Sequence, residues 1–212
     1  MSDGHVVIVL AAGGSERLGR PKQLLMRDGE TLVHRAARIA LETAPASVYV
    51  VVGAAGDDVI DAVRDLPCRI VPNTAWHEGL ASSLRAAGDA FAMDGMSAQQ
   101  NMPVPLRPVL IMACDQPAID VAHLQALLDG AAHATSRCAA TRHGDAVGVP
   151  AVVPLGWFNG DERPGGDAGF GRALRDLPAG SLALLDIADL RLDIDTPGDL
   201  REAIARGWLD PS

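Results

Sequence analysis

The chain has 212 residues, which fits a single domain, and its 48 % hydrophobic and 21 % charged residues are ordinary for a soluble globular protein. Aromatic residues make up only 3 %, so the core must be built from aliphatic side chains. The formal net charge of −9 argues against binding to nucleic acid or to an anionic membrane, because both need clustered Lys and Arg, although a local pocket of cations can still hold a phosphate ligand.

Strand-like runs and helix-like patterns alternate along the chain. The first strand, at residues 5–10, is a continuous apolar run, which is typical of a strand covered on both faces. Further strands are predicted at residues 48–52, 69–71, 109–112, 138–141, 149–153, 182–185 and 190–194. Helices are predicted at residues 31–44, 57–66, 80–91, 121–134 and 196–206. Residues 92–107 are predicted to form a surface insertion, and residues 154–167, rich in Gly, Pro and Asp, a mobile loop.

This order of elements predicts an α/β fold of three layers, in which a mostly parallel central sheet lies between two layers of helices. Ligands of such sheets bind outside the carboxyl ends of the strands. The segments that follow residues 10, 71 and 112 are therefore the candidates for a binding site.

The first of these segments reads LAAGGSERLGRPK over residues 10–22. Its small residues let the backbone approach a ligand closely, and successive N–H groups in such a turn can point at phosphate oxygens. Arg17 suits a forked grip on phosphates and Lys22 a point charge. The alternative is an ordinary glycine-rich turn with two solvated cations; neither Walker A nor dinucleotide spacing is present. The predicted nucleotide contacts are Leu10, Ala11, Ala12, Gly13, Gly14, Ser15, Arg17 and Lys22.

The third segment places Asp115 just after the apolar strand at residues 109–112. A carboxylate in this place points into the ligand crevice of a parallel sheet. Mg²⁺ prefers hard oxygen ligands and usually takes one or two carboxylates together with substrate phosphates, so Asp115 is a candidate ligand. The alternative is an Asp that merely begins a turn before Pro117.

The loop resembles the L-A-A-G-x-S-x-R-x-G-x-x-K signature of the MobA-like nucleotidyltransferases. Its continuation, Lys-Gln-Leu-Leu at residues 22–25, resembles the molybdenum cofactor cytidylyltransferase branch, whereas the guanylyltransferase branch usually reads L-A-G-G where position 12 here is Ala. The resemblance extends over nearly the whole chain. It implies a Rossmann-like, GT-A-like fold, Mg²⁺ as cofactor, CTP as the favoured nucleoside triphosphate and molybdopterin as the phosphate-bearing acceptor.

Two further segments resemble motifs of this family. Residues 73–83 resemble N-x-x-W-x-x-G-x-x-x-S, which lies beside the nucleobase, so the resemblance implies that Gly79 lets the base come close and that Ser82 or Ser83 binds it. The alternative is that both serines cap or back-bond a helix. Residues 193–200 resemble D-I-D-T-P-x-D-L, which implies that Asp195 is the second metal ligand.

Other positions near these motifs have secondary roles. Asp193 is the fallback ligand, because it lies on the same side of an extended strand as Asp195, and Asp199 is predicted to be structural, in the first turn of a helix.

The acceptor side is predicted from a weaker match. The family shows G-x-P followed by G-D-x-G-A-R, which implies acceptor contacts from Gly148, Pro150 and Asp167. Phe170 and Gly171 replace the Ala-Arg pair, and the nearest arginine, Arg172, stands one place later, so the match does not assign it the family's role.

The resemblance implies transfer of a nucleotidyl group to the acceptor phosphate with release of pyrophosphate. Lys22, Arg17 and Asp115 are the predicted catalytic residues, and Asp115 and Asp195 the metal ligands. Residues 1–212 form one domain, with residues 1–117 as the nucleotide-binding half and residues 118–212 as the half that binds the acceptor and closes the fold. A molybdoenzyme or its chaperone is an expected partner, whereas nucleic acid and membranes are not.

Three other functions remain open. A transferase that acts on a sugar 1-phosphate or another small phosphate shares the loop but usually lacks the Lys-Gln-Leu-Leu continuation. A non-catalytic accessory protein would bind the cofactor and hand it to a molybdoenzyme. An oxidoreductase would use a Rossmann-like pocket, against which the missing dinucleotide fingerprint argues.

Cysteine usage and the amino terminus predict a cytoplasmic protein. Cys68, Cys114 and Cys138 are far apart and form no C-x-x-C pair, which is typical of buried thiols in a reducing compartment. The first residues include the acidic Asp3 and no basic segment of a secretory signal, and the apolar run at residues 6–12 is too short to span a bilayer.

Overall fold

The structure, a computed structural model, describes residues 4–95, 107–144, 146–159 and 169–211. The strands are β1 Val6–Ala11, β2 Met26–Arg27, β3 Glu30–Thr31, β4 Ser47–Val52, β5 Arg69–Pro72, β6 Pro108–Ala113, β7 Ala139–His143, β8 Ala146–Pro154 and β9 Ala183–Leu185. The α-helices are α1 Leu32–Glu42, α2 Gly56–Val63, α3 Leu80–Met93, α4 Val121–His133, α5 Gly171–Arg175 and α6 Pro197–Ala205. Short 3-10 helices are η1 Lys22–Leu24, η2 Trp76–Glu78, η4 Leu155–Phe158 and η6 Ala188–Arg191.

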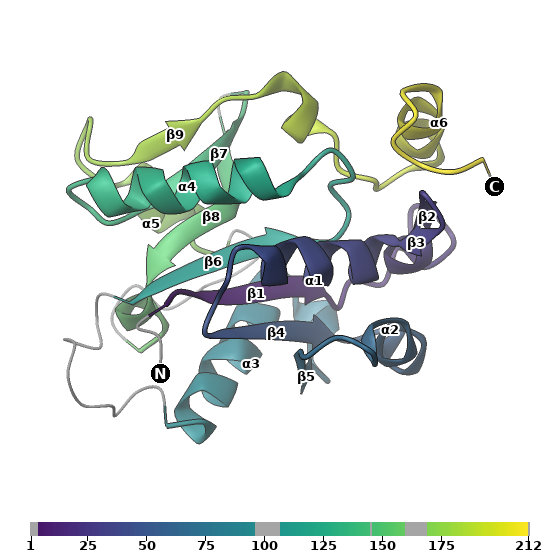
Figure 1. The fold of residues 1–212 in the computed structure, drawn as a ribbon, viewed down its shortest axis with the longest axis horizontal. Coiled ribbons are helices and arrows are strands. Elements are labelled where there is room, and N and C mark those ends of the chain that lie inside the picture. The colour runs from purple at the N-terminus through teal and green to yellow at the C-terminus, as the bar shows by residue number, and fades with distance from the viewer. Residues whose placement is uncertain (1–3, 96–106, 145, 160–168, 212) are drawn as a thin grey trace.

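Seven strands form one sheet in the order β5-β4-β1-β6-β8-β7-β9 (Figure 1). The strands β5, β4, β1 and β6 pair in parallel, and among the described strands of this sheet only β8 runs against its neighbours. The carboxyl ends of the parallel strands therefore meet at one edge, on the right in Figure 1. The predicted α/β fold with a mostly parallel sheet is confirmed.

The side chains of β1 show why the sheet needs helices on both faces. Val7, Val9 and Ala11 pack into one buried cluster with α1, α2 and α4. Val6, Ile8 and Leu10 pack into the other, with α3, α5 and η4. Because successive side chains of a strand point to opposite faces, a strand between two cores must be apolar throughout. All six residues of β1 are buried, as the continuous apolar run predicts.

A third, smaller cluster joins the carboxyl-terminal segment to the loop after β1. Leu18 and Leu25 from the loop pack with Ile194, Ala203 and Leu209 from the region of α6. The α6 helix begins as its sequence predicts, because the Thr196 side chain accepts a hydrogen bond from the backbone N–H three residues on, with Pro at the first helical position. This packing brings the carboxyl-terminal segment to the edge of the sheet where the loop after β1 lies.

Several boundaries differ from the sequence prediction. The predicted strand at residues 190–194 is wrong: η6 occupies residues 188–191, and the chain then runs without strand pairing to Thr196. Its apolar residues serve packing instead, since Leu190 and Ile194 are fully buried. The α3 helix continues to Met93, so the predicted insertion does not begin at residue 92.

The predicted loop at residues 154–167 is also partly wrong, because η4 at its start places Leu155 and Phe158 in the core. The remainder of that loop, from residue 160, and residues 96–106 of the predicted insertion lie outside the described residues.

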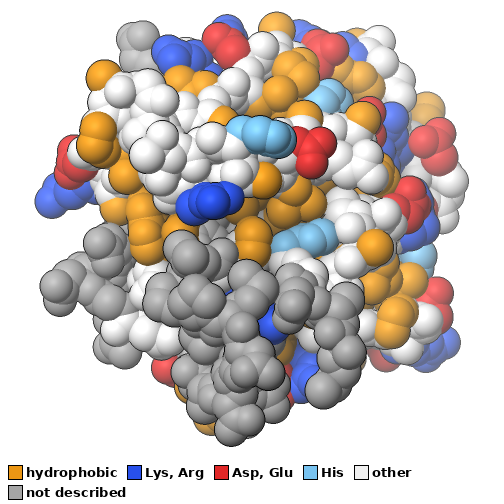
Figure 2. Space-filling view, turned by 60° about the vertical axis from the view of Figure 1, so that its left-hand side comes forward, with side chains coloured by type: hydrophobic (Ala, Val, Ile, Leu, Met, Phe, Trp, Pro, Cys, Tyr) orange, Lys and Arg blue, Asp and Glu red, His pale blue; other side chains and the backbone are white. Residues whose placement is uncertain are grey.

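The side of the molecule at the amino ends of the parallel strands is shown in Figure 2. Acidic, basic and hydrophobic side chains are interspersed on the described part of this face. Among the described helices, none is both long and apolar enough to cross a bilayer.

Candidate active site at the carboxyl ends of the parallel strands

The loop after β1 folds around the buried side chain of Gln23. The Gln23 amide donates to the carbonyl oxygens of Ala11, at 3.1 Å, and Gly13, at 2.7 Å. Since the N–H and C=O of a trans peptide point in opposite directions, the N–H groups of the next residues, Ala12 and Gly14, point away from Gln23. Such outward amides suit an anion. Gln23 enters the sequence prediction only as part of a family signature, and its role in shaping the loop is not predicted there.

Ser15 completes the loop. Its backbone has a positive φ of 53°, and its hydroxyl accepts a hydrogen bond from the backbone N–H of Lys22 at 3.1 Å. The hydroxyl also lies 3.5 Å from Oε1 of Gln23, to which it donates. Ser15 therefore ties the two ends of the loop together.

Trp76 lies against the loop because two glycines leave room for it. A Cβ on Gly14 would lie 2.7 Å from Cζ3 of Trp76, and a Cβ on Gly53 would lie 2.5 Å from the carbonyl oxygen of Ala12 and 2.8 Å from Cβ of Trp76. Gly13, by contrast, has open space around it. The glycine at position 14 thus serves packing, and Gly53 was not singled out in the sequence.

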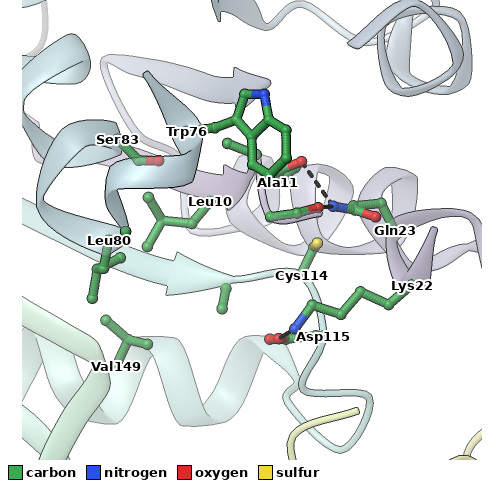
Figure 3. Close-up of a pocket in the computed structure, with 14 residues that line it drawn as sticks. Leu10, Ala11, Lys22, Gln23, Trp76, Leu80, Ser83, Cys114, Asp115 and Val149 are labelled. Atoms are coloured by element: carbon green, nitrogen blue, oxygen red, sulfur yellow. Dashed lines mark hydrogen bonds and ion pairs between the residues drawn. The ribbon is translucent and has the colours of Figure 1, made fainter. Parts of the chain in front are cut away.

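A cleft of about 240 Å³ opens beside the loop (Figure 3). Figure 3 shows Trp76 on one side of the cleft, Ser83 and Leu80 of α3 on another, and Lys22 extended toward Asp115. Of the predicted site residues, the cleft is lined by Leu10, Ala11, Ala12, Gly13, Lys22, Gly79, Ser83 and Asp115. Lining residues that the sequence did not single out are Gln23, Leu80, Ala113, Cys114 and Val149.

Lys22 joins the two predicted metal ligands. Its Nζ lies 2.5 Å from Oδ2 of Asp115 and 2.7 Å from Oδ1 of Asp195. A backbone hydrogen bond from Ile194 to the carbonyl oxygen of Asp115, at 3.0 Å, holds the two segments side by side. Although burial opposes the charge of Lys22, the two carboxylates raise its pKa well above the ordinary value, so the ammonium is retained.

Arg17 is the more exposed cation of the site. Its guanidinium lies 2.8 Å from Oδ2 of Asp195, and 70 % of its side chain is exposed, against 15 % for Lys22. An exposed arginine is free to reorient toward a phosphate at little cost.

The carboxylates suit a hard divalent cation. Oδ1 of Asp115 is buried and has no hydrogen-bond partner among the described residues. A buried carboxylate oxygen without a hydrogen-bond partner lowers the stability of the fold unless a ligand, ion or water binds it. The described residues hold no group of three or more metal-ligating side chains, so at most two carboxylates are offered. Mg²⁺ fits this set, because it takes one or two carboxylates and completes its shell with substrate phosphates and water.

Asp193 and Asp199 do not share this arrangement. Asp199 accepts hydrogen bonds from the backbone N–H groups of Asp195, at 3.1 Å, and Thr196, at 2.7 Å, which confirms its structural role. Oδ1 of Asp193 accepts from Nε2 of Gln116 at 2.8 Å. Partial desolvation and the nearby Asp115 carboxylate raise the pKa of Asp193 to about 6, although the residue stays exposed at the surface.

The two serines of α3 have different environments. Nδ2 of Asn73 donates to the hydroxyls of Ser82, at 2.8 Å, and Ser83, at 3.0 Å. Ser82 in turn donates to the carbonyl oxygen of Gly79 at 2.8 Å and does not line the cleft, so the capping alternative describes it better than the predicted contact with a base. Gly79 has a φ of 89°, which favours glycine at the start of this helix.

The described residues predicted to contact the acceptor lie near the cleft but do not line it. Gly148 and Pro150 lie in β8, but only Val149 between them lines the cleft. The carbonyl oxygen of Val149 accepts from Nε2 of Gln116 at 3.1 Å and lies 3.0 Å from Nε2 of His143. Asp167 lies outside the described residues.

Phe170, which stands where the family motif has alanine, packs in the hydrophobic core. It is 4 % exposed, and its ring lies 5.1 Å from that of Phe158 in an edge-to-face arrangement.

A backbone loop at the carboxyl end of the first strand lies beside a cleft lined by Lys22 and Asp115, with Asp195 paired to Lys22 and Arg17 paired to Asp195, and this arrangement suits a nucleotidyltransferase. Residues 7–181 match the family described as the MobA-like NTP transferase domain, and the chain belongs to this family.

The chain is similar in structure to several solved proteins. One is the homologue of Rv0371c from Mycobacterium sp. strain JC1, with 28 % identity, 98 % of both chains covered and a TM-score of 0.75. A nucleotidyl transferase from Methanothermobacter has 22 % identity, 97 % and 98 % coverage and a TM-score of 0.73. The manganese complex of Rv0371c from Mycobacterium tuberculosis has 23 % identity, 97 % and 100 % coverage and a TM-score of 0.71. No curated protein matches the chain.

Proposed function

We propose that the protein transfers the cytidylyl group of CTP to the phosphate of molybdopterin or its molybdenum-loaded form, with release of pyrophosphate. The observation that supports nucleotidyl transfer most directly is the position of Lys22 between Asp115 and Asp195, beside a backbone loop suited to phosphates. The choice of CTP rests on Ala at position 12 and on the Lys-Gln-Leu-Leu continuation of the loop.

In the proposed reaction an oxygen of the acceptor phosphate bonds to the α-phosphorus, and the bond from that phosphorus to the bridging oxygen of pyrophosphate breaks. The chain supplies no covalent nucleophile in this scheme; it positions the reactants and offsets their charge. Lys22 stabilises the α-phosphate, Arg17 reorients to the β- and γ-phosphates, and the amides of Ala12 and Gly14 complete the cradle. Asp115 and Asp195 would hold Mg²⁺, which neutralises phosphate charge when bound.

The two halves of the domain divide these tasks in the proposal. Residues 1–117 bind the triphosphate, and residues 118–212 bind the acceptor and close the site through Asp195. The half with Gly148 and Pro150 presents Val149 to the cleft, opposite the loop. Asp167 is retained as a proposed acceptor contact. A molybdoenzyme or its chaperone would receive the product.

Thermal-shift measurements with each of the four nucleoside triphosphates and Mg²⁺ test the base. A ligand that binds only the folded state raises the melting temperature according to its affinity. A shift confined to CTP, followed by pyrophosphate release with molybdopterin, is expected. A shift confined to GTP or UTP would overturn the cytidylyl assignment.

A second candidate is transfer to a sugar 1-phosphate or another small phosphate. The departure from the family motif at Phe170 and Gly171 favours it, because the family's Ala-Arg pair on the acceptor side is missing. Pyrophosphate release with such an acceptor, and none with molybdopterin, would establish it. Tight binding of nucleotide without pyrophosphate release from any acceptor would instead indicate an accessory protein.

A further inference from the structure

The chain's own cations hold three of the four carboxylate oxygens at the candidate metal site. Lys22 takes Oδ2 of Asp115 and Oδ1 of Asp195, and Arg17 takes Oδ2 of Asp195 at 2.8 Å. The fourth oxygen, Oδ1 of Asp115, is buried and unpartnered. Two negative and two positive charges therefore balance within the protein.

A divalent cation and the Lys22 ammonium cannot both bind the carboxylates of Asp115 and Asp195 at the same time. An ion bound by Asp115 and Asp195 would lie within a few ångströms of Nζ, and at partly shielded separations of this size like charges repel strongly. The side chains of Lys22 and Asp115 are only 15 % and 14 % exposed, so water screens their interaction poorly. The metal must therefore displace Lys22 from its carboxylates.

A triphosphate offers Lys22 a different partner. Lys22 and Gly13 line the same cleft, so phosphates held by the loop amides would lie beside the lysine and compete with the carboxylates for its ammonium. When the Lys22 ammonium reorients toward the phosphates, the carboxylate oxygens of Asp115 and Asp195 become available to the metal.

We propose that Lys22 is an internal counter-cation that keeps divalent metals off Asp115 and Asp195 until a triphosphate draws its ammonium away. The proposal rests on the proposed function for the roles of these three residues. Its consequence is that metal and triphosphate bind with positive coupling, and each binds weakly alone.

The first test measures Mn²⁺ binding by electron paramagnetic resonance in the absence of any nucleotide. Lys22→Gln is expected to tighten Mn²⁺ binding roughly tenfold relative to the wild type, since it removes one charge from a partly shielded site. Arg85→Gln, a matched loss of one positive charge from an exposed pair with Glu78, is expected to leave the affinity unchanged. Unchanged or weaker binding by Lys22→Gln would overturn the proposal.

The second test measures the reciprocal competition and does not depend on Lys22→Gln folding. Tripolyphosphate is titrated calorimetrically with chelator present, so that no metal takes part. Asp195→Asn is expected to tighten tripolyphosphate binding several-fold, because it removes a competitor for Lys22. Asp193→Asn makes the same charge change at a carboxylate that Lys22 does not contact and should have a smaller effect. Equal effects of the two variants would contradict the proposal.

A third variant separates this proposal from the assignment of the metal site. If Lys22→Gln/Asp195→Asn keeps the full Mn²⁺ affinity of Lys22→Gln, then Asp195 is not a metal ligand, and the proposed function fails at that point together with this proposal. If the double variant loses Mn²⁺ binding while Lys22→Gln binds no more tightly than the wild type, the metal site stands and only the counter-cation role is excluded.

Discussion

The side-chain amide of Gln23 donates a 2.7 Å hydrogen bond to the carbonyl oxygen of Gly13, ten residues before it in the chain. Gln23 is 1 % exposed and lies inside the loop that is proposed to bind the triphosphate. The conformation of that loop therefore depends on a neutral side chain that can donate two hydrogen bonds. This makes the loop sensitive to a change that alters hydrogen bonding without altering size.

Gln23→Glu is expected to weaken both folding and triphosphate binding. The carboxylate cannot donate to the carbonyl oxygens of Ala11 and Gly13, and a buried group left without its partner costs about 1–3 kcal/mol. Urea denaturation and a CTP titration of the folded variant measure the two effects. Gln125→Glu, at an exposed position of α4, is the matched control and should leave both quantities unchanged. A Gln23→Glu variant with wild-type affinity would show that the loop does not depend on this amide.

Gly53→Ala is expected to destabilise the protein by roughly 1–3 kcal/mol, the usual cost of overpacking. The added methyl would lie 2.5 Å from the carbonyl oxygen of Ala12, which cannot move without shifting the loop. Gly56→Ala is the control, because a Cβ at that position meets nothing within 4 Å. Urea denaturation compares the two, and equal stabilities would argue against close packing of the segment after β4 on the loop.

Asp115→Asn is expected to lower metal-dependent turnover at least about a hundredfold, as loss of a group that stabilises developing charge does. Asp193→Asn makes the same substitution at a carboxylate that contacts Gln116 and should retain most of the activity. Steady-state pyrophosphate release at saturating Mg²⁺ measures both. Turnover of Asp115→Asn at the wild-type level would contradict the assignment of Asp115 as a metal ligand.

The stability of the protein is expected to depend on the charge of His34. Its Nδ1 lies 2.5 Å from Glu30 and its Nε2 3.2 Å from Asp65. Although desolvation opposes the charge, these carboxylates raise the pKa of His34 above its ordinary value. A raised folded pKa contributes stability that is complete below the unfolded pKa of about 6.5 and is lost as the pH rises through the folded pKa.

His34→Gln should therefore cost more stability near about pH 6 than near about pH 9, where both proteins lack this charge. Urea denaturation at the two pH values gives the difference. His133→Gln, the same substitution at an exposed position near the end of α4, serves as the comparison. The same loss at both pH values for His34→Gln would mean that the imidazole acts by packing alone.

Local patterns in the sequence predict much of the fold. The unbroken apolar run of β1 indicates a strand between two cores, because only a doubly covered strand is apolar at every position. The Thr196 cap and the following proline mark the start of α6 for an equally local reason. The loop after β1 and Asp115 after β6 could be placed at one edge of the sheet, since parallel strands end together.

Only the tertiary structure decides which distant groups meet. Lys22 and Asp195 are 173 residues apart, and they come within 2.7 Å because the carboxyl-terminal segment packs on the loop through Leu18, Ile194 and Leu209. Their spacing in the sequence alone leaves Asp193 and Asp195 as alternative metal ligands, because both would face the same side of a strand. The segment pairs with no strand and turns Asp193 to Gln116 instead. Periodicity reports which face of one element is buried, whereas contacts such as these depend on how separate elements pack.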